Sequence, residues 1–308
     1  MMLPWLRLVR LPNLATAVAD PLAGFLIVSQ ARQLDWPPPA GWLAVGAVVF
    51  LYAAGMVLND VCDVELDRRE RPERPLPRGD VSLGAAATAG GLLLAGGVAL
   101  AAGLAWLVAS PWPAVFGIAL AVAVWLYDRH AKATPLGPVV MGGCRSAAWL
   151  LGMMAAGGPT AGEQWLIPSG MGLYVMGITL YARDEAGRSR KPLLVAGTLI
   201  MLLGLVIAAG FVWLGDRGPI ELVGGPRMPV SNWLLLWALI VTSILYRAAM
   251  GVADPTPGRV RFAVGNAIMS IITLDAILVL AACGERWAIV VLCLLAWFLF
   301  FKRLVPPT

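Results

Sequence analysis

The chain has 308 residues, of which 59% are hydrophobic and only 13% are charged. Soluble domains carry about 25% charged residues, so this composition excludes an ordinary soluble enzyme and a disordered chain. It also excludes a nucleic-acid-binding protein, although the net charge is +5, and leaves a protein with many membrane spans.

Ten apolar runs approach the roughly 20 residues that a helix needs to cross a bilayer. The runs are continuous and do not alternate in polarity, which favours helices over the strands of a β-barrel. We predict an all-α, polytopic transmembrane helical bundle that forms a single domain over residues 1–308, preceded by a short interfacial helix at residues 2–11. The last two runs are joined by a short polar segment at Gly284, and if they form one broken element the spans number nine. The predicted spans are 13–31, 41–58, 83–109, 112–127, 135–157, 164–181, 192–214, 231–250, 262–283 and 286–304.

Lysine and arginine are unevenly distributed around these spans. With ten spans, the side that holds both termini carries 18 of the 23 basic residues, and the opposite side carries four. The remaining one, Arg145, lies within a span. Because cytoplasmic loops are enriched in Lys and Arg, both termini are predicted to be cytoplasmic. We therefore predict an integral, multi-pass protein, in the inner membrane if the source is bacterial, with its acidic loops on the cytoplasmic side.

Charge is concentrated in residues 59–80, which hold seven acids and five arginines. Asn59, Asp63 and Asp67 recur every four residues, and Asp60 lies beside them, so a helix would place these groups on one face. Clustered carboxylates suit Mg²⁺, which commonly bridges to substrate phosphates, and the arginines that follow can neutralise the same phosphates. A solvated loop is the alternative, but three prolines between residues 72 and 77 fix the path of the chain, which favours a site.

Two further segments carry weaker signals. Asp184 and Glu185 follow the sixth run, and they form either a second wall opposite the first cluster or a basic loop that enforces topology. Arg145 lies within the fifth run, where an arginine faces a partner or cavity or extends to the interface. His130, in the segment that precedes this run, favours an interfacial role over a catalytic one.

The acidic segment resembles the first motif of the UbiA superfamily of intramembrane prenyltransferases, NDxxDxxxDxxxRPxRP. Its elements are present here as Asn59, Asp60, Asp63, Asp67, Arg71-Pro72 and Arg74-Pro75. The resemblance extends over nearly the whole chain and implies a helical bundle around a cavity that opens to lipid. It also implies two aspartate-rich motifs that bind Mg²⁺ and a prenyl diphosphate, whose prenyl group alkylates an acceptor.

The resemblance further implies roles for individual residues. The metal ligands would be Asp60, Asp63, Asp67 and Asp184, and Asn59 would join them in the catalytic group. The residues that bind substrate would be Arg71, Arg74, Lys132, Arg145, Arg183, Glu185 and Arg188.

The second motif departs from the family pattern. When Gly187 is set on the motif glycine, Asp184 is retained, but Arg188 and Ala186 replace acids and Tyr181 replaces the earliest aspartate. The second metal site is therefore depleted. This segment, together with Cys144-Arg145, looks most like the EboC-type branch of the superfamily.

Two alternatives remain open at this point. CDP-alcohol phosphotransferases are also rich in aspartate, but their signature has a glycine where Val64 follows Asp63. A non-catalytic lipid-diphosphate binder or a transporter with the same fold is the other alternative, since a fold does not fix a function. The acceptor, the length of the prenyl chain and the oligomeric state do not follow from the sequence.

Overall fold

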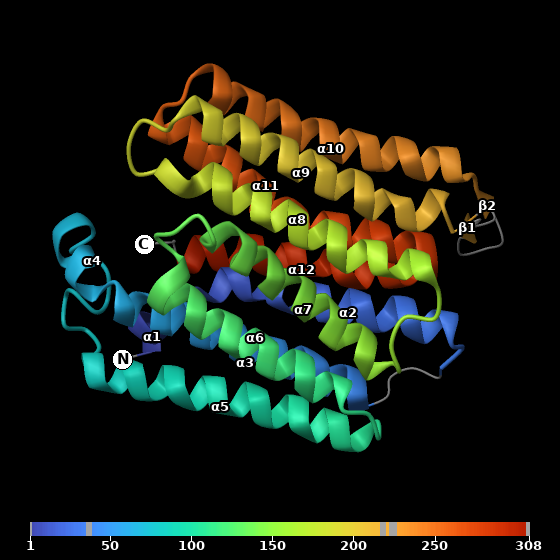
Figure 1. Ribbon diagram of the computed structural model, residues 1–308, viewed down its shortest axis with the longest axis horizontal. Helices are drawn as coiled ribbons and strands as arrows, with labels where there is room; N and C mark the ends of the chain where they lie inside the picture. The colour runs from blue at the N-terminus through green and yellow to red at the C-terminus, as the bar shows by residue number, and fades with distance from the viewer. Residues whose placement is uncertain (1, 35–38, 216–219, 222–226, 306–308) are drawn as a thin grey trace.

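The computed structural model describes residues 2–34, 39–215, 220–221 and 227–305, in which long helices lie side by side along the longest axis (Figure 1). Ten helices in this described part have 15 residues or more. They are α2 (Leu14–Ala31), α3 (Pro39–Cys62), α5 (Leu83–Leu107), α6 (Trp112–Leu126), α7 (Gly137–Ala155), α8 (Leu166–Tyr181), α9 (Lys191–Trp213), α10 (Val230–Ala253), α11 (Pro257–Cys283) and α12 (Glu285–Leu304).

Each of the ten predicted spans corresponds to one of these helices. Within the described ranges, nine helices are long and apolar enough to cross a membrane. The tenth is α7, which has 19 residues and carries Arg145 in its interior. The multi-span all-α architecture is therefore confirmed, and α7 is the helix that separates a count of nine from a count of ten.

Short elements join the long helices. They are α1 (Met2–Leu8), the 3₁₀ turns η1 (Leu11–Asn13), η3 (Gly162–Trp165) and η4 (Ala182–Asp184), α4 (Val64–Glu70), the π-helical turn η2 (Tyr127–Ala131), and the antiparallel strands β1 (Ile220–Glu221) and β2 (Arg227–Met228). A helix is present in the segment predicted to be interfacial, as α1, and its place at the membrane surface stays a prediction.

Local sequence accounts for several helix ends. Ser82 caps α5, because its hydroxyl oxygen accepts a hydrogen bond from the backbone N–H of Ala85 at 3.2 Å. Gly284 separates α11 from α12 with a φ of 77°, a left-handed value that glycine adopts without strain. The last two predicted spans therefore form a hairpin of two helices, not one broken element.

The bundle has two distinct ends, and its apolar side chains lie on the outside as well as in the core. Both termini, α4 and the α8–α9 connection lie at one end, and β1 and β2 lie at the other (Figure 1). Helix α2 is the central helix and is buried along most of its length. On outer helices, Leu92, Leu235 and Leu239 are 66% to 69% exposed. Large apolar side chains on the outer surface, with the few buried charged groups kept inside the bundle, fit a lipid environment.

Candidate active site

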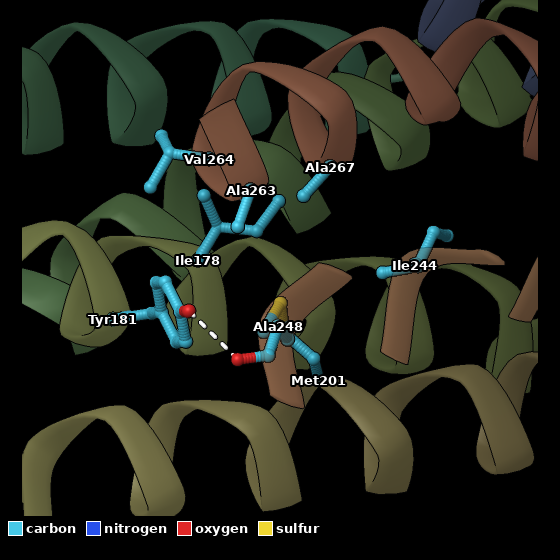
Figure 2. Close-up of a pocket in the computed structure, with 8 residues that line it drawn as sticks. All are labelled: Ile178, Tyr181, Met201, Ile244, Ala248, Ala263, Val264 and Ala267. Carbon is cyan, nitrogen blue, oxygen red and sulfur yellow. Dashed lines mark hydrogen bonds between the residues drawn. The ribbon is translucent and has the colours of Figure 1, made fainter. Parts of the chain in front are cut away.

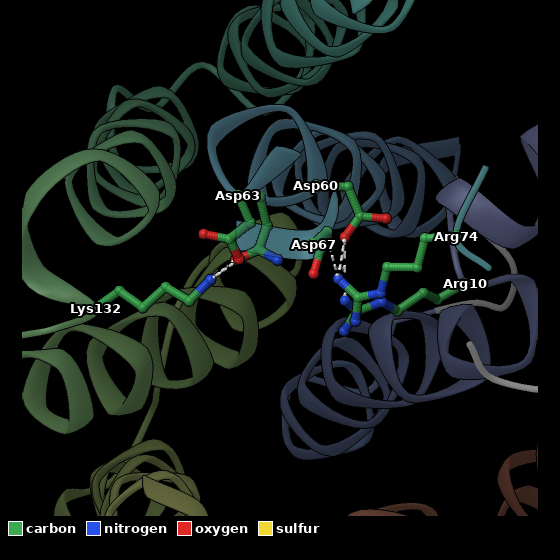
Figure 3. Close-up of polar contacts among 7 residues, drawn as sticks. Arg10, Asp60, Asp63, Asp67, Arg74 and Lys132 are labelled. Carbon is green, nitrogen blue, oxygen red and sulfur yellow. Dashed lines mark hydrogen bonds and ion pairs between the residues drawn. The ribbon is translucent and has the colours of Figure 1, made fainter. Parts of the chain in front are cut away.

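The acidic residues of the first cluster divide between two sets of partners. Helix α3 ends at Cys62 and α4 begins at Val64, but the helical path continues, since the Asp63 N–H donates to the Asn59 carbonyl at 3.0 Å. Successive residues on such a path point about 100° apart. The four groups therefore share one broad face, as the spacing predicts, but their partners divide them into two pairs, Asn59 with Asp63 and Asp60 with Asp67 (Figure 3).

One pair is bound by arginine. Arg74 Nη1 donates to Asp67 Oδ2 at 2.7 Å and to Asp60 Oδ1 at 3.3 Å, and Arg10 Nη2 donates to Asp60 Oδ1 at 3.3 Å. Arg74 is only 4% exposed, and so are both of its carboxylate partners. Its backbone N–H bonds to the Arg71 carbonyl at 3.1 Å, in a compact turn within the proline-rich segment. Asp60 and Asp67 thus hold two guanidinium groups at the end of the bundle.

The other pair converges on a lysine ammonium. Lys132 Nζ donates to Asn59 Oδ1 at 2.8 Å and also to Asp63 Oδ2 (Figure 3). Lys132 follows the π-helical turn that ends α6, and it reaches across to α3. The side chains of Lys132 and Asp63 are 36% and 19% exposed, so this pair is open to a ligand to a degree that Asp60 and Asp67 are not.

The second acidic-basic segment lies beside Lys132. The Arg183 guanidinium donates to the Ala133 carbonyl at 2.8 Å, which ties the end of α8 to the turn that holds Lys132. Asp184 faces Arg190, whose Nε and Nη2 donate to its two carboxylate oxygens at 2.8 and 3.3 Å. Arg188 is exposed. In this structure the Asp184 carboxylate is therefore already bound by a neighbour on its own segment.

Glu185 is the acid of this segment whose carboxyl group is acted on by arginines from other segments at this end of the bundle. Burial raises the pKa of Glu185, while the positive charges of Arg71, Arg261 and Arg10 act in the opposite direction. Those arginines come from the segment after α4, the N-terminal part of α11 and the N-terminal segment. The second wall that the sequence suggested stays a prediction, and Glu185 is the acid of this segment on which arginines near the first cluster act.

Arg145 lies inside the bundle. Its Nη1 is 2.6 Å from Asp20 Oδ2 in α2, and the two side chains are 9% and 0% exposed. Asp275 of α11 is also fully buried. Arg145 therefore faces a carboxylate partner, one of the options for an intramembrane arginine. Its role at a diphosphate stays a prediction.

Tyr181, which stands in place of the earliest aspartate of the second motif, points away from this end cluster. Its hydroxyl donates to the Ala248 carbonyl at 2.9 Å and so links α8 to α10 (Figure 2). A Cβ at Gly251 would lie 2.0 Å from this hydroxyl oxygen. An apolar pocket surrounds the ring and is lined by Ile178, Met201, Ile244, Ala248, Ala263, Val264 and Ala267.

Three charged residues of this end were missed by sequence reasoning. Arg10 pairs with Asp60 from a left-handed backbone conformation, with a φ of 48°, a strained geometry that clusters at functional sites. Arg261 acts on Glu185, and Asp128 lies near Lys132 and Asp63. Arg10 with Asp60, Arg261 with Glu185, and Asp128 with Asp63 join segments far apart in the sequence, so no motif spacing marked them. Among the described residues, no three His, Cys, Asp or Glu side chains converge as a ready-made metal site.

Comparisons with known proteins agree with this fold. Residues 21–264 match the model of the UbiA prenyltransferase family. A digeranylgeranylglyceryl phosphate synthase of Methanoculleus marisnigri is 30% identical over 83% of this chain and 89% of its own length. Among solved structures, a UbiA homologue from Aeropyrum pernix superposes with a TM-score of 0.63 at 21% identity, over 87% of this chain and 97% of that one. A homologue from Archaeoglobus fulgidus bound to GPP and Mg²⁺ gives a TM-score of 0.65 at 15% identity, over 94% and 99%.

The structural likenesses establish the fold, while the family match and the M. marisnigri relative cover most of the chain. They place the protein among prenyltransferases and not among the CDP-alcohol phosphotransferases. The chain therefore belongs to the UbiA prenyltransferase family and is an integral, multi-pass membrane enzyme.

Proposed function

We propose that the protein transfers a prenyl group from a prenyl diphosphate to an acceptor within the membrane, in a reaction that depends on Mg²⁺. The single observation that carries this proposal is the convergence of Asn59 Oδ1 and Asp63 Oδ2 on one ammonium. These two side-chain oxygens already bind one cation, the ammonium, at a partly exposed position, so they can also serve as ligands of a metal cation. A. fulgidus homologues bound to GPP or DMAPP with Mg²⁺ support the choice of ligand.

The donor chemistry fits Mg²⁺. This ion is usually bound by one or two carboxylates together with waters and substrate phosphates, and Asn59 with Asp63 supplies such a partial set. Asp60 and Asp67 are bound to arginine, so we assign them to positioning Arg74 and Arg10. When bound, Mg²⁺ would neutralise the charge that develops on the departing diphosphate.

The chain's own residues account for the rest of the proposed reaction. Lys132 and Arg71 would bind the diphosphate oxygens and hold the prenyl C1 atom at the end of the bundle. The bond between C1 and the diphosphate oxygen breaks, and its electrons leave with the diphosphate. A new bond then forms between C1 and the acceptor, which loses a proton. The surrounding helices keep water from the allylic cation.

The site end is proposed to face the cytoplasm. The N-terminal segment, α4 and the α8–α9 connection share this end (Figure 1). With the other connections on the side that holds both termini, it carries 18 of the 23 basic residues. We leave the acceptor open, although the name of the M. marisnigri relative makes a prenylated glyceryl phosphate the first one to test.

The test uses purified full-length protein in lipid nanodiscs with a labelled prenyl diphosphate, with and without Mg²⁺. Asp63→Asn removes the proposed cation place, and Asp184→Asn is the matched control, because Asp184 is bound by Arg190. We expect Mg²⁺-dependent binding and diphosphate release that are lost in Asp63→Asn and retained in Asp184→Asn.

Other outcomes of this test have definite meanings. Binding without release, across acceptors and prenyl lengths, would favour a non-catalytic binder. Loss of activity in Asp184→Asn would restore Asp184 as a metal ligand. The absence of any binding would overturn the site.

A further inference from the structure

The turn that holds Lys132 is π-helical. Residues Tyr127–Ala131 follow α6 as a π-helix, and the Lys132 N–H donates to the Tyr127 carbonyl at 3.0 Å. Such turns admit one more residue than an α-turn and are frequent at functional sites. Here the turn brings Asp128 and Lys132, four residues apart, toward the same neighbour, because Lys132 and Asp63 are the charged groups that act most strongly on the Asp128 carboxyl.

Asp128 has a carboxylate oxygen without a donor. Its Oδ2 is inaccessible to solvent and has no hydrogen-bond partner among the described residues. Leaving such an oxygen unpaired costs free energy, more for a charged group than for a neutral one. The cation that acts most strongly on it is Lys132, whose ammonium has three donors and directs two of them to Asn59 and Asp63.

On the other side, Asp128 lines a cavity of about 310 Å³ together with Leu58, Cys62, Trp125 and Arg129. Asp128 thus lines this cavity and is also acted on by the charges of Lys132 and Asp63. A shift of the Lys132 side chain toward Asp128 would pair the orphaned oxygen and vacate the place between Asn59 and Asp63.

We propose that Asp128 is a positioning residue that receives the Lys132 ammonium when a divalent cation takes its place between Asn59 and Asp63. This inference rests on the proposed function, since it assigns a cation to that place. Lys132 is then the internal counter-ion of Asp63 in the substrate-free protein, and metal binding is an exchange of cations. In both states Asp63 is paired, and in the bound state Asp128 is paired as well.

This exchange of cations predicts that substitutions at Lys132 and at Asp128 change the affinity for the metal in opposite directions. Lys132→Met removes the competing cation, so the metal should bind more tightly. Asp128→Asn removes the group that accepts the displaced ammonium, so the metal should bind more weakly. A hydrogen bond to a charged group corresponds to a change in affinity on the order of tenfold. In the double variant, Asp128→Asn should have no further effect, because no ammonium remains to be received.

The experiment measures binding of Mn²⁺ by electron paramagnetic resonance, with the full chain in nanodiscs and without prenyl diphosphate. Glu65→Gln is the matched control, since Glu65 is an exposed acid of the same end paired with Arg68. Asp128→Glu retains a carboxylate and should restore Mn²⁺ affinity if Asp128→Asn impairs it.

Three results would overturn the inference. They are an unchanged affinity in Asp128→Asn, a weaker affinity in Lys132→Met, and an equal loss from Asp128→Asn with or without Lys132. The last result would make Asp128 a direct ligand. Asp63→Asn separates the two proposals: if it leaves Mn²⁺ binding intact, the proposed cation place itself is refuted.

Discussion

Removal of the buried Arg145 guanidinium should destabilise the bundle strongly. Arg145→Met would leave Asp20, which has no exposed surface, without the cation that now lies 2.6 Å from its Oδ2. Removing one partner of a buried ion pair costs about 3–5 kcal/mol, because the other charge stays buried and uncompensated. The 9% and 0% exposure of the two side chains leaves little solvent screening to reduce that value.

The double variant decides whether the pair itself is the cause. Arg145→Met combined with Asp20→Asn removes both charges, and replacement of a whole buried pair by neutral groups is often close to neutral. We therefore expect the double variant to be more stable than either single variant. The coupling free energy of this cycle measures the interaction between the two side chains.

The measurement combines denaturant unfolding in mixed micelles with the affinity for a labelled prenyl diphosphate. A buried structural pair predicts a large loss of stability in Arg145→Met and near-normal affinity in the molecules that remain folded. If Arg145→Met keeps its stability and loses diphosphate affinity, this reasoning is refuted. Arg145 would then belong to the substrate site, as the family resemblance implied.

Three further outcomes can be measured on the same purified protein. Gly251→Ala should lower stability by about 1–3 kcal/mol, as overpacking does, and by less in a Tyr181→Phe background, because the hydroxyl 2.0 Å from the new Cβ is then absent. Because the folded protein raises the pKa of Glu185, its carboxyl group stabilises the fold fully below its ordinary pKa of 4.5, and this stabilisation is lost as pH rises through the folded-state pKa. The melting temperature of Glu185→Gln should therefore rise relative to that of the parent as pH increases. A difference in melting temperature that is constant with pH would contradict this. Arg74→Met should cost about 3–5 kcal/mol, because it leaves the buried Asp67 carboxylate unpaired and Asp60 with Arg10 alone. Arg74→Lys should restore this only in part, since one ammonium cannot reproduce the geometry of a guanidinium, and full recovery would show that only charge matters.

The arrangement of helices could be predicted because it depends on local composition. Each apolar run became a helix whose ends differ from the prediction by a few residues, except that α11 begins at Pro257 where the predicted span began at 262. An apolar run that is long enough to cross a bilayer forms a helix, because only a helix satisfies the hydrogen bonds of its backbone within the same segment. Helix α7 has a lower mean hydropathy because it carries Arg145. The guanidinium of Arg145 is paired inside the bundle with Asp20, which lies more than a hundred residues earlier in the chain.

The side-chain partners of the acidic cluster could not be predicted from spacing. A spacing of four places Asn59 near Asp63, but it does not show that Asp60 turns toward Arg10 and Arg74. Those contacts depend on where the N-terminal segment and the proline-rich turn meet the end of α3. The sequence motif therefore located the site, while the division of the site between arginine and lysine partners required the fold.

This division has a consequence for how a charged substrate can bind. Asp60, Asp63 and Asp67 each have a basic partner within the protein, so the described site carries its own counter-ions. A prenyl diphosphate that brings a divalent cation adds both signs of charge at once. Lys132, freed from Asp63 by the cation, is then available to the diphosphate and to Asp128. Binding of metal and diphosphate should therefore be mutually cooperative, by the reciprocity of linked equilibria. Independent affinities in the parent protein would contradict this coupling, and loss of cooperativity in Lys132→Met alone would assign it to the lysine.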